Sequence, residues 1–176
     1  MFGLGKAARA RQEAADRLYG AIVAAARRPA FYARWGVPDT AEGRFEMIAI
    51  HAFAVMRRLK AMGAAGAGLS QTLYDTLFED MDRNLREMGI GDMGVGKRIK
   101  KLAKAFYGRI AAYEAGLADA DDEALLTALR RNVYGGADGA DAPALARYVR
   151  ALKPALDALA EPELLGGRAT FPAVPD

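Results

Sequence analysis

The sequence contains no cysteine and only one histidine, His51, among its 176 residues. The absence of cysteine excludes disulfides, thiolate nucleophiles and zinc–thiolate sites, and it fits a reducing compartment. Any metal site or catalytic triad that needs an imidazole would have to be built around His51. Ser70 is the only serine, and its surroundings show no nucleophile-elbow pattern. The sequence therefore offers little material for covalent catalysis, and we expect no cofactor and no metal.

Long apolar runs are also missing. Lys6, Arg9 and Arg11 interrupt the N-terminal segment, which therefore lacks the apolar stretch of about 7–15 residues that a secretory signal requires. The longest apolar runs, 21–26 and 49–56, fall well short of the roughly 20 residues of a membrane-spanning helix. The net charge of +3 is a mild basic bias, which permits an anionic partner without requiring one.

The apolar residues that are present recur with the period of amphipathic helices, and no alternating β-branched run predicts a strand. With 52% hydrophobic residues, the chain can bury one core, so we expect an all-α fold with a single compact domain. We divide it into an N-terminal helix (1–30), a main helical domain (31–160) and a flexible C-terminal tail (161–176). About seven helices are expected, with starts near residues 7, 29, 39, 70, 93, 121 and 141.

Three of these helices depend on specific capping predictions. Asp39 and Glu42 form a D-x-x-E capping pattern. Ser70 is predicted to cap a new helix after glycines at 63, 66 and 68 break the chain, and Asp141 is predicted to cap the last long helix.

A glycine-rich stretch, MGIGDMGVGK, occupies residues 88–97 and matches two nucleotide-binding patterns. Gly89, Gly91 and Gly94 give G-x-G-x-x-G, whereas Gly91, Gly96 and Lys97 give G-x-x-x-x-G-K. Both motifs need a preceding strand that delivers the loop to a helix N-terminus. Here the preceding segment is helical, so an enzyme that binds nucleotide through Gly91–Lys97 is the disfavoured alternative.

A tight corner between two helices explains the same stretch better. Gly89 follows a helix end, where a left-handed residue closes the cap, and Ile90 can pack back on the last turn. Asp92 is suited to cap the next helix. Gly94 and Gly96 remain unexplained by this interpretation, because each costs about 1 kcal/mol in a helix relative to alanine.

A basic stripe follows the glycine stretch. Lys97, Lys100, Lys101 and Lys104 recur at i, i+3, i+4 and i+7, with Arg98 beside them, and 97–109 contains no acidic residue. Such a face is often simply solvated. It can also bind an acidic protein, RNA or an anionic membrane.

Three segments resemble the ubiquinol–cytochrome c chaperone family, the assembly factors for cytochrome b of the respiratory bc1 complex. They are LFEDMDRNLREMGIGDMGVGKRIKKLAKAFYGR (77–109), FYARWGVPDTAEGRFEMIAIHAFAVMRRL (31–59) and ALLTALRRNVYGG (124–136). The resemblance implies an all-helical, non-enzymatic chaperone that works with a small partner protein. It also implies binding near the ribosomal tunnel exit and receipt of newly made cytochrome b. No transit peptide or hydrophobic anchor precedes the shared region, which is typical of a bacterial, cytoplasmic member that could be peripheral at the inner membrane.

The expected binding residues follow from these two arguments. The basic residues 97, 98, 100, 101 and 104 are candidates for docking on a ribosome or on an anionic membrane surface, and no DNA partner is expected. The candidates for a client groove are aromatic or flexible apolar residues, namely Phe31, Tyr32, Trp35, Met81, Met88 and Met93. The aromatic three also fit a hydrophobic anchor, and a basic RNA-binding module remains the alternative function. His51 lies beside an apolar stripe, where a packed histidine is commoner than a haem or metal ligand.

Overall fold

The structure, a computed structural model, describes residues 2–136 and 141–174 and is helical, with no strand in these two ranges. The all-α prediction is confirmed. In chain order the helices are α1 (Phe2–Ala26), α2 (Pro29–Ala33), α3 (Ala41–Lys60), α4 (Gly63–Glu87), α5 (Asp92–Ala118), α6 (Glu123–Asn132), α7 (Ala142–Asp157) and α8 (Glu161–Leu165).

Helix α3 is the centre of the core. It contacts α1, α4, α5 and α7, and it is buried along most of its length. Thr40 rather than Asp39 caps it, because the Thr40 hydroxyl accepts a hydrogen bond from the Gly43 amide at 3.1 Å. Asp39 instead forms an ion pair with Arg44 at 2.8 Å.

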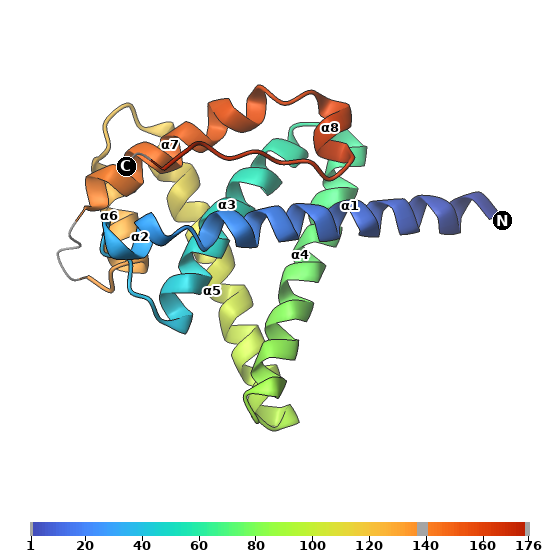
Figure 1. Ribbon diagram of the computed structural model, residues 1–176, viewed down its shortest axis with the longest axis horizontal. Helices are drawn as coiled ribbons and strands as arrows, with labels where there is room; N and C mark the ends of the chain where they lie inside the picture. The colour runs from blue at the N-terminus through green and yellow to red at the C-terminus, as the bar shows by residue number, and fades with distance from the viewer. Residues whose placement is uncertain (1, 137–140, 175–176) are drawn as a thin grey trace.

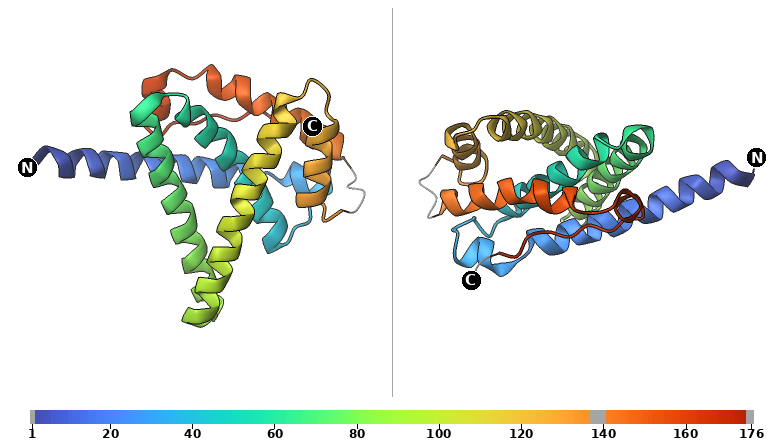
Figure 2. Two further views of the ribbon diagram at one scale, coloured as in Figure 1. Left: turned by 180° about the vertical axis from the view of Figure 1, so that it is seen from behind. Right: turned by 90° about the horizontal axis from the view of Figure 1, so that it is seen from above.

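Helices α4 and α5 form a long hairpin whose tip projects away from the rest of the molecule (Figure 1; Figure 2). The corner at the tip matches the prediction at Gly89, which has a positive φ of 81° and follows α4 rather than a strand. The predicted cap at Asp92 is wrong: Gly91 is the N-cap residue of α5, and Asp92, its first helical residue, pairs with Arg86. The structure also explains Gly94, because a Cβ there would lie 2.9 Å from Cγ2 of Ile90. The glycine stretch thus forms a helix–helix turn and lacks the strand that either phosphate-binding motif requires.

The predicted helix start at Ser70 is wrong. Helix α4 begins at Gly63 and continues through Gly66 and Gly68, so that Ser70 is buried inside it. A Cβ at Gly66 would lie 1.9 Å from the Leu59 carbonyl oxygen. Glycine therefore allows the first turn of α4 to pack against the end of α3, rather than breaking the helix.

The segment after α7 follows a path that the sequence did not predict. Within 161–174, α8 is followed by an extended stretch that returns along α1 (Figure 1). Arg17 Nη2 donates to the Gly166 carbonyl at 2.9 Å, and Arg28 donates to the Pro172 carbonyl. Residues 175 and 176 of the predicted flexible tail lie outside the described residues.

Candidate functional site

The predicted basic stripe forms a solvent-exposed face of α5 near the hairpin tip. Lys97, Lys100, Lys101 and Lys104 are exposed, as is Arg98 beside them. In the described part of the chain, none of these five cations lies within 4 Å of a carboxylate. The positive charge is therefore available to an external anion.

Exposed apolar side chains lie beside these cations. Among the described residues, the large hydrophobic side chains that remain exposed are Met88, Met93 and Tyr107, at 69%, 85% and 57% exposure. All three belong to the α4–α5 hairpin. Met93 precedes Lys97 by four residues and Tyr107 follows Lys104 by three, so both lie on the lysine face of α5.

The six residues predicted to form a client groove do not come together. Phe31 and Trp35 are buried in the core and pack edge-to-face at 5.4 Å, as the alternative of a hydrophobic anchor requires. Tyr32 is half-buried beside them and donates to the Ala26 carbonyl at 2.8 Å. Met81 is half-buried against the core, which leaves Met88 and Met93 as the exposed members of the set.

A cleft that the sequence did not predict lies between α3, α5 and α7. It has a volume of about 350 Å³, near the lower end of the range for ligand sites. Its floor is apolar and consists of Phe53, Ala54, Leu117, Val149, Leu152 and Leu156. The convergence of three helices that leaves this hollow is a tertiary feature, which no single segment of the sequence predicts.

The rim of this cleft is charged. Arg57 Nε donates to both carboxylate oxygens of Glu114 at 3.0 Å, and Lys153 pairs with Asp157. Arg58 lies at the same rim, 3.5 Å from Asp157, but its buried Nε forms no hydrogen bond with any described residue. The cleft can thus bury an apolar side chain while a polar group beside it meets a charged partner.

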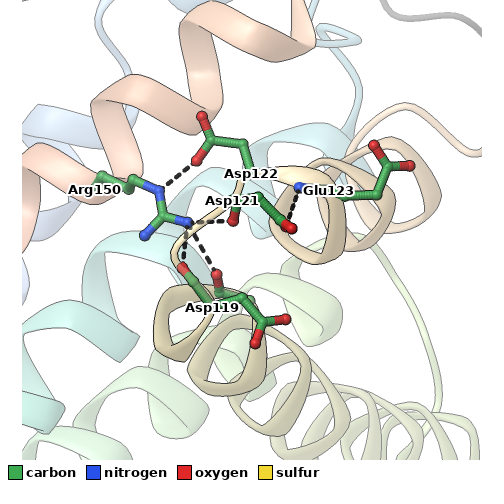
Figure 3. A network of polar contacts seen from close by, with 6 residues as sticks. Asp119, Asp121, Asp122, Glu123 and Arg150 are labelled. Carbon is green, nitrogen blue, oxygen red and sulfur yellow. Dashed lines mark hydrogen bonds and ion pairs between the residues drawn. The ribbon is translucent and has the colours of Figure 1, made fainter.

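A network around Arg150 holds the helices that form the cleft (Figure 3). Arg150 projects from α7, and its Nη2 donates to the carbonyls of Gly116, Asp119 and Asp121 at 3.2, 3.0 and 2.8 Å, whereas its Nε pairs with Asp122. One side chain thereby fastens α7 to the turn between α5 and α6. Gly116 assists, because a Cβ there would lie 2.7 Å from Cα of Leu125 in α6.

His51 is fully buried on α3 and is hydrogen-bonded at both ring nitrogens. Its Nδ1 lies 2.7 Å from the Met47 carbonyl, which can only accept, so Nδ1 carries the proton. Nε2 then accepts a hydrogen bond from the Tyr148 hydroxyl at 2.9 Å. Burial lowers the pKa of His51 to about 4. The lone pair that a haem iron or a metal would need is already engaged by Tyr148.

A second buried polar contact joins α3 to α5. Arg109 donates through Nε and Nη2 to the two carboxylate oxygens of Glu46, whose side chain is 5% exposed. Arg109 also lies over the Phe45 ring, 5.7 Å from its centroid. Burial raises the pKa of Glu46, whereas the Arg109 charge and hydrogen bonds oppose that shift.

These features indicate a class of protein. The described residues contain no group of three or more potential metal ligands. No helix among them is both long enough and apolar enough to cross a membrane. The apolar-floored cleft and the exposed basic face on the projecting hairpin are surfaces of the kind found in all-helical proteins that bind partners.

The chain belongs to the ubiquinol–cytochrome c chaperone family, whose model matches residues 33–171. It is 28% identical over 154 residues to ubiquinol–cytochrome c reductase complex assembly factor 1 of Xenopus laevis, covering 86% of this chain and 76% of the relative. It is 29% identical over 147 residues to Protein CBP3, mitochondrial, of Saccharomyces cerevisiae, covering 80% of this chain and 44% of the relative. The resemblance of the three segments to this family is therefore confirmed.

The fold is also similar to a solved structure, the crystal structure of the Cbp3 homolog from Brucella abortus. The two chains superpose with a TM-score of 0.86 at 40% identity, over 97% of this chain and 95% of the other. The chain spans about half the length of the mouse relative of the same name as the Xenopus protein, 52% of it at 27% identity. The matched region is thus the helical domain, and the longer relatives contain further sequence.

Proposed function

We propose that this protein is an assembly chaperone for ubiquinol–cytochrome c reductase, that its client is newly made cytochrome b, and that it acts by binding without covalent chemistry. Membership of the chaperone family supports the assembly role. The observation that carries the binding mechanism is the cleft between α3, α5 and α7, with its apolar floor and charged rim.

The size of the cleft limits what it can hold. At about 350 Å³ it accommodates anchoring side chains rather than a whole helix. An amphipathic client helix would place apolar residues spaced at i, i+3 or i+4 against Val149, Leu152 and Leu156, as in helix-in-groove recognition. Each buried Leu- or Phe-sized anchor would contribute roughly 1.5–3 kcal/mol.

The rim would then orient the client. The Arg57–Glu114 and Arg58–Asp157 pairs flank the apolar floor. A client that places a polar group beside its apolar anchor would meet one of these charged side chains, and hydrogen bonds to charged groups are stronger than those between neutral groups. This polar selection adds specificity to apolar burial.

The basic face of α5 would serve a separate purpose. We assign the five cations at 97, 98, 100, 101 and 104 to docking on an anionic surface, because they are exposed and no carboxylate of the described residues pairs with them. The runner-up function, an RNA- or ribosome-binding module, rests on the same five residues. A small partner protein remains part of the proposal on the strength of the family resemblance alone.

A crosslinked pull-down of the tagged protein from growing cells tests the client proposal, with cytochrome b and ribosomes probed together. Ala61, at the cleft margin, is replaced by tryptophan to fill the entrance, and exposed Ala24 on α1 receives the same change as a control. We expect wild type and Ala24→Trp to recover cytochrome b and Ala61→Trp to lose it. Recovery of ribosomes or RNA without cytochrome b would replace the client proposal with the RNA-binding one.

A further inference from the structure

We propose that the lysine face of α5, together with Met88 and Met93 at the hairpin tip, docks the protein on an anionic lipid membrane. This inference rests on the proposed docking function of the basic face and names its partner. The main observation is one of position. Among the described residues, the exposed large apolar side chains lie on the same hairpin as the lysines that have no carboxylate partner there.

The arrangement along α5 is that of an interfacial helix. Met93, Lys97, Lys100, Lys104 and Tyr107 follow one another at spacings of three or four residues, which places them on one face. At 1.5 Å per residue this face is about 21 Å long. Residues 93–113 contain no acidic side chain. The nearest acids at the hairpin tip are Asp92, which pairs with Arg86, and the exposed Glu87 of α4.

Each part of this face has a role at a lipid surface. Lysines near anionic headgroups add to binding individually, by about fivefold each. Methionine side chains that are exposed in water can enter the boundary between headgroups and acyl chains, as the apolar residues of interfacial helices do. Met88 and Met93 flank the turn between α4 and α5 and are exposed. This turn is the end of the hairpin that projects away from the rest of the molecule (Figure 1).

Lipid explains the face better than nucleic acid does. Proteins that bind single-stranded nucleic acid alternate basic residues with aromatic rings on which bases stack. Here the two most exposed of the large apolar residues described are Met93 and Met88, which offer no stacking surface. Among the side chains that the structure describes, the one exposed aromatic is Tyr107, and its ring already packs against Tyr74 with centroids 5.6 Å apart. RNA would use the lysines but would leave Met88 and Met93 in water.

Binding of the purified protein to lipid vesicles tests the proposal. It is measured by co-sedimentation and by the fluorescence of an attached label rather than of tryptophan. The vesicles contain phosphatidylcholine alone or with about 30% phosphatidylglycerol, which supplies the anionic surface potential. We expect binding to the anionic vesicles only, weakening as salt shortens the screening length from about 10 Å at 0.1 M to about 3 Å at 1 M. Equal binding to both vesicle types would overturn the proposal.

Three variants separate the contributions. The lysine variant carries K97Q, K100Q, K101Q and K104Q. Its control removes four exposed cations elsewhere and so has the same net charge, through R27Q, K60Q, R130Q and R147Q. The methionine variant carries M88Q and M93Q.

We expect the lysine variant to bind anionic vesicles several hundredfold more weakly, from about fivefold for each of four lysines. The charge-matched control should retain most of the binding, and the methionine variant should lose about tenfold for each side chain that no longer enters the membrane. Circular dichroism of each variant shows whether it is folded. An unchanged affinity in the lysine variant, or equal losses in the lysine variant and its control, would refute docking through α5.

RNA binding is measured in parallel with purified ribosomal RNA. Lysine-dependent RNA binding that ignores the methionines, without vesicle binding, would replace the membrane with RNA as the partner. The vesicle assay contains no client, and Ala61→Trp should bind vesicles as wild type does. Failure of membrane docking and failure of client binding are therefore read separately.

Discussion

The buried histidine makes the acid stability of this protein predictable. His51 is neutral in the folded protein, because burial lowers its pKa to about 4 from an ordinary value of 6.5. In the unfolded chain the same group takes up a proton near pH 6.5. The contribution of neutral His51 to the free energy of unfolding is therefore complete above pH 6.5 and is lost as the pH falls towards 4. The difference in pKa corresponds to about 3 kcal/mol of unfolding free energy.

This contribution can be isolated because the chain has a single histidine. Urea unfolding is measured between pH 7 and pH 4 for wild type and for His51→Gln, which does not titrate. Acidic side chains titrate in both proteins, so their effects largely cancel in the difference. We expect the stability advantage of wild type over His51→Gln to shrink by about 3 kcal/mol across this range.

NMR supplies an independent reading, since the imidazole C–H resonances belong to one residue. They should stay at neutral-form positions down to about pH 5 and move only as the pH approaches 4. A midpoint near 6.5, or a stability difference that does not change with pH, would refute the buried, doubly hydrogen-bonded geometry with Met47 and Tyr148.

Three further predictions concern contacts between helices. Arg109→Met should lower the free energy of unfolding in urea by about 3–5 kcal/mol, because it leaves the buried Glu46 carboxylate without its partner. The loss should be smaller at pH 5 than at pH 8, because protonation of Glu46 removes its charge. A Glu46→Gln/Arg109→Met double variant as unstable as Arg109→Met alone would contradict this. Gly116→Ala should lower the free energy of unfolding by about 1–3 kcal/mol through overpacking. The control Gly108→Ala, where the added Cβ meets open space, should raise the free energy of unfolding by about 1 kcal/mol. Melting temperatures that shift in the same direction for both variants would count against the close helix contact at Gly116. Arg150→Ala should lower the free energy of unfolding by about 2–3 kcal/mol, because its hydrogen bonds to three carbonyls are lost. The control Arg147→Ala removes an exposed arginine and should change it by no more than about 0.5 kcal/mol. Equal denaturation midpoints for the two variants would show that Arg150 does not fasten α7 to the turn between α5 and α6.

The sequence predicted what depends on local chemistry. Asp141 caps α7 as expected, with its carboxylate accepting from the Ala144 amide at 3.1 Å. Gly89 adopts the left-handed conformation that a helix C-terminus favours. The lysine spacing correctly predicted one exposed face of α5, because helical geometry alone decides which side chains share a face.

The features that depend on tertiary packing escaped prediction. Ser70 has the chemistry of a cap but is buried within α4, since the preceding glycines serve a close approach to α3. The cleft exists because three helices from distant parts of the chain meet at an angle that no single segment encodes. The return of 166–174 along α1 likewise depends on arginines at 17 and 28, which lie about 150 residues away in sequence.

Helix α5 contributes residues to both the basic face and the cleft. Met93 and the lysines occupy its first half, whereas Glu114 and Leu117 at its far end line the cleft. At 1.5 Å and 100° per residue, the 24 residues from Met93 to Leu117 separate the two by about 36 Å along one axis. The number of residues between them therefore sets the angle about the helix axis between the basic face and the cleft. One residue inserted between Lys104 and Glu114 would turn the basic face by about 100° relative to the cleft. A docked protein can present its cleft in only one direction, and the length of this helix determines which.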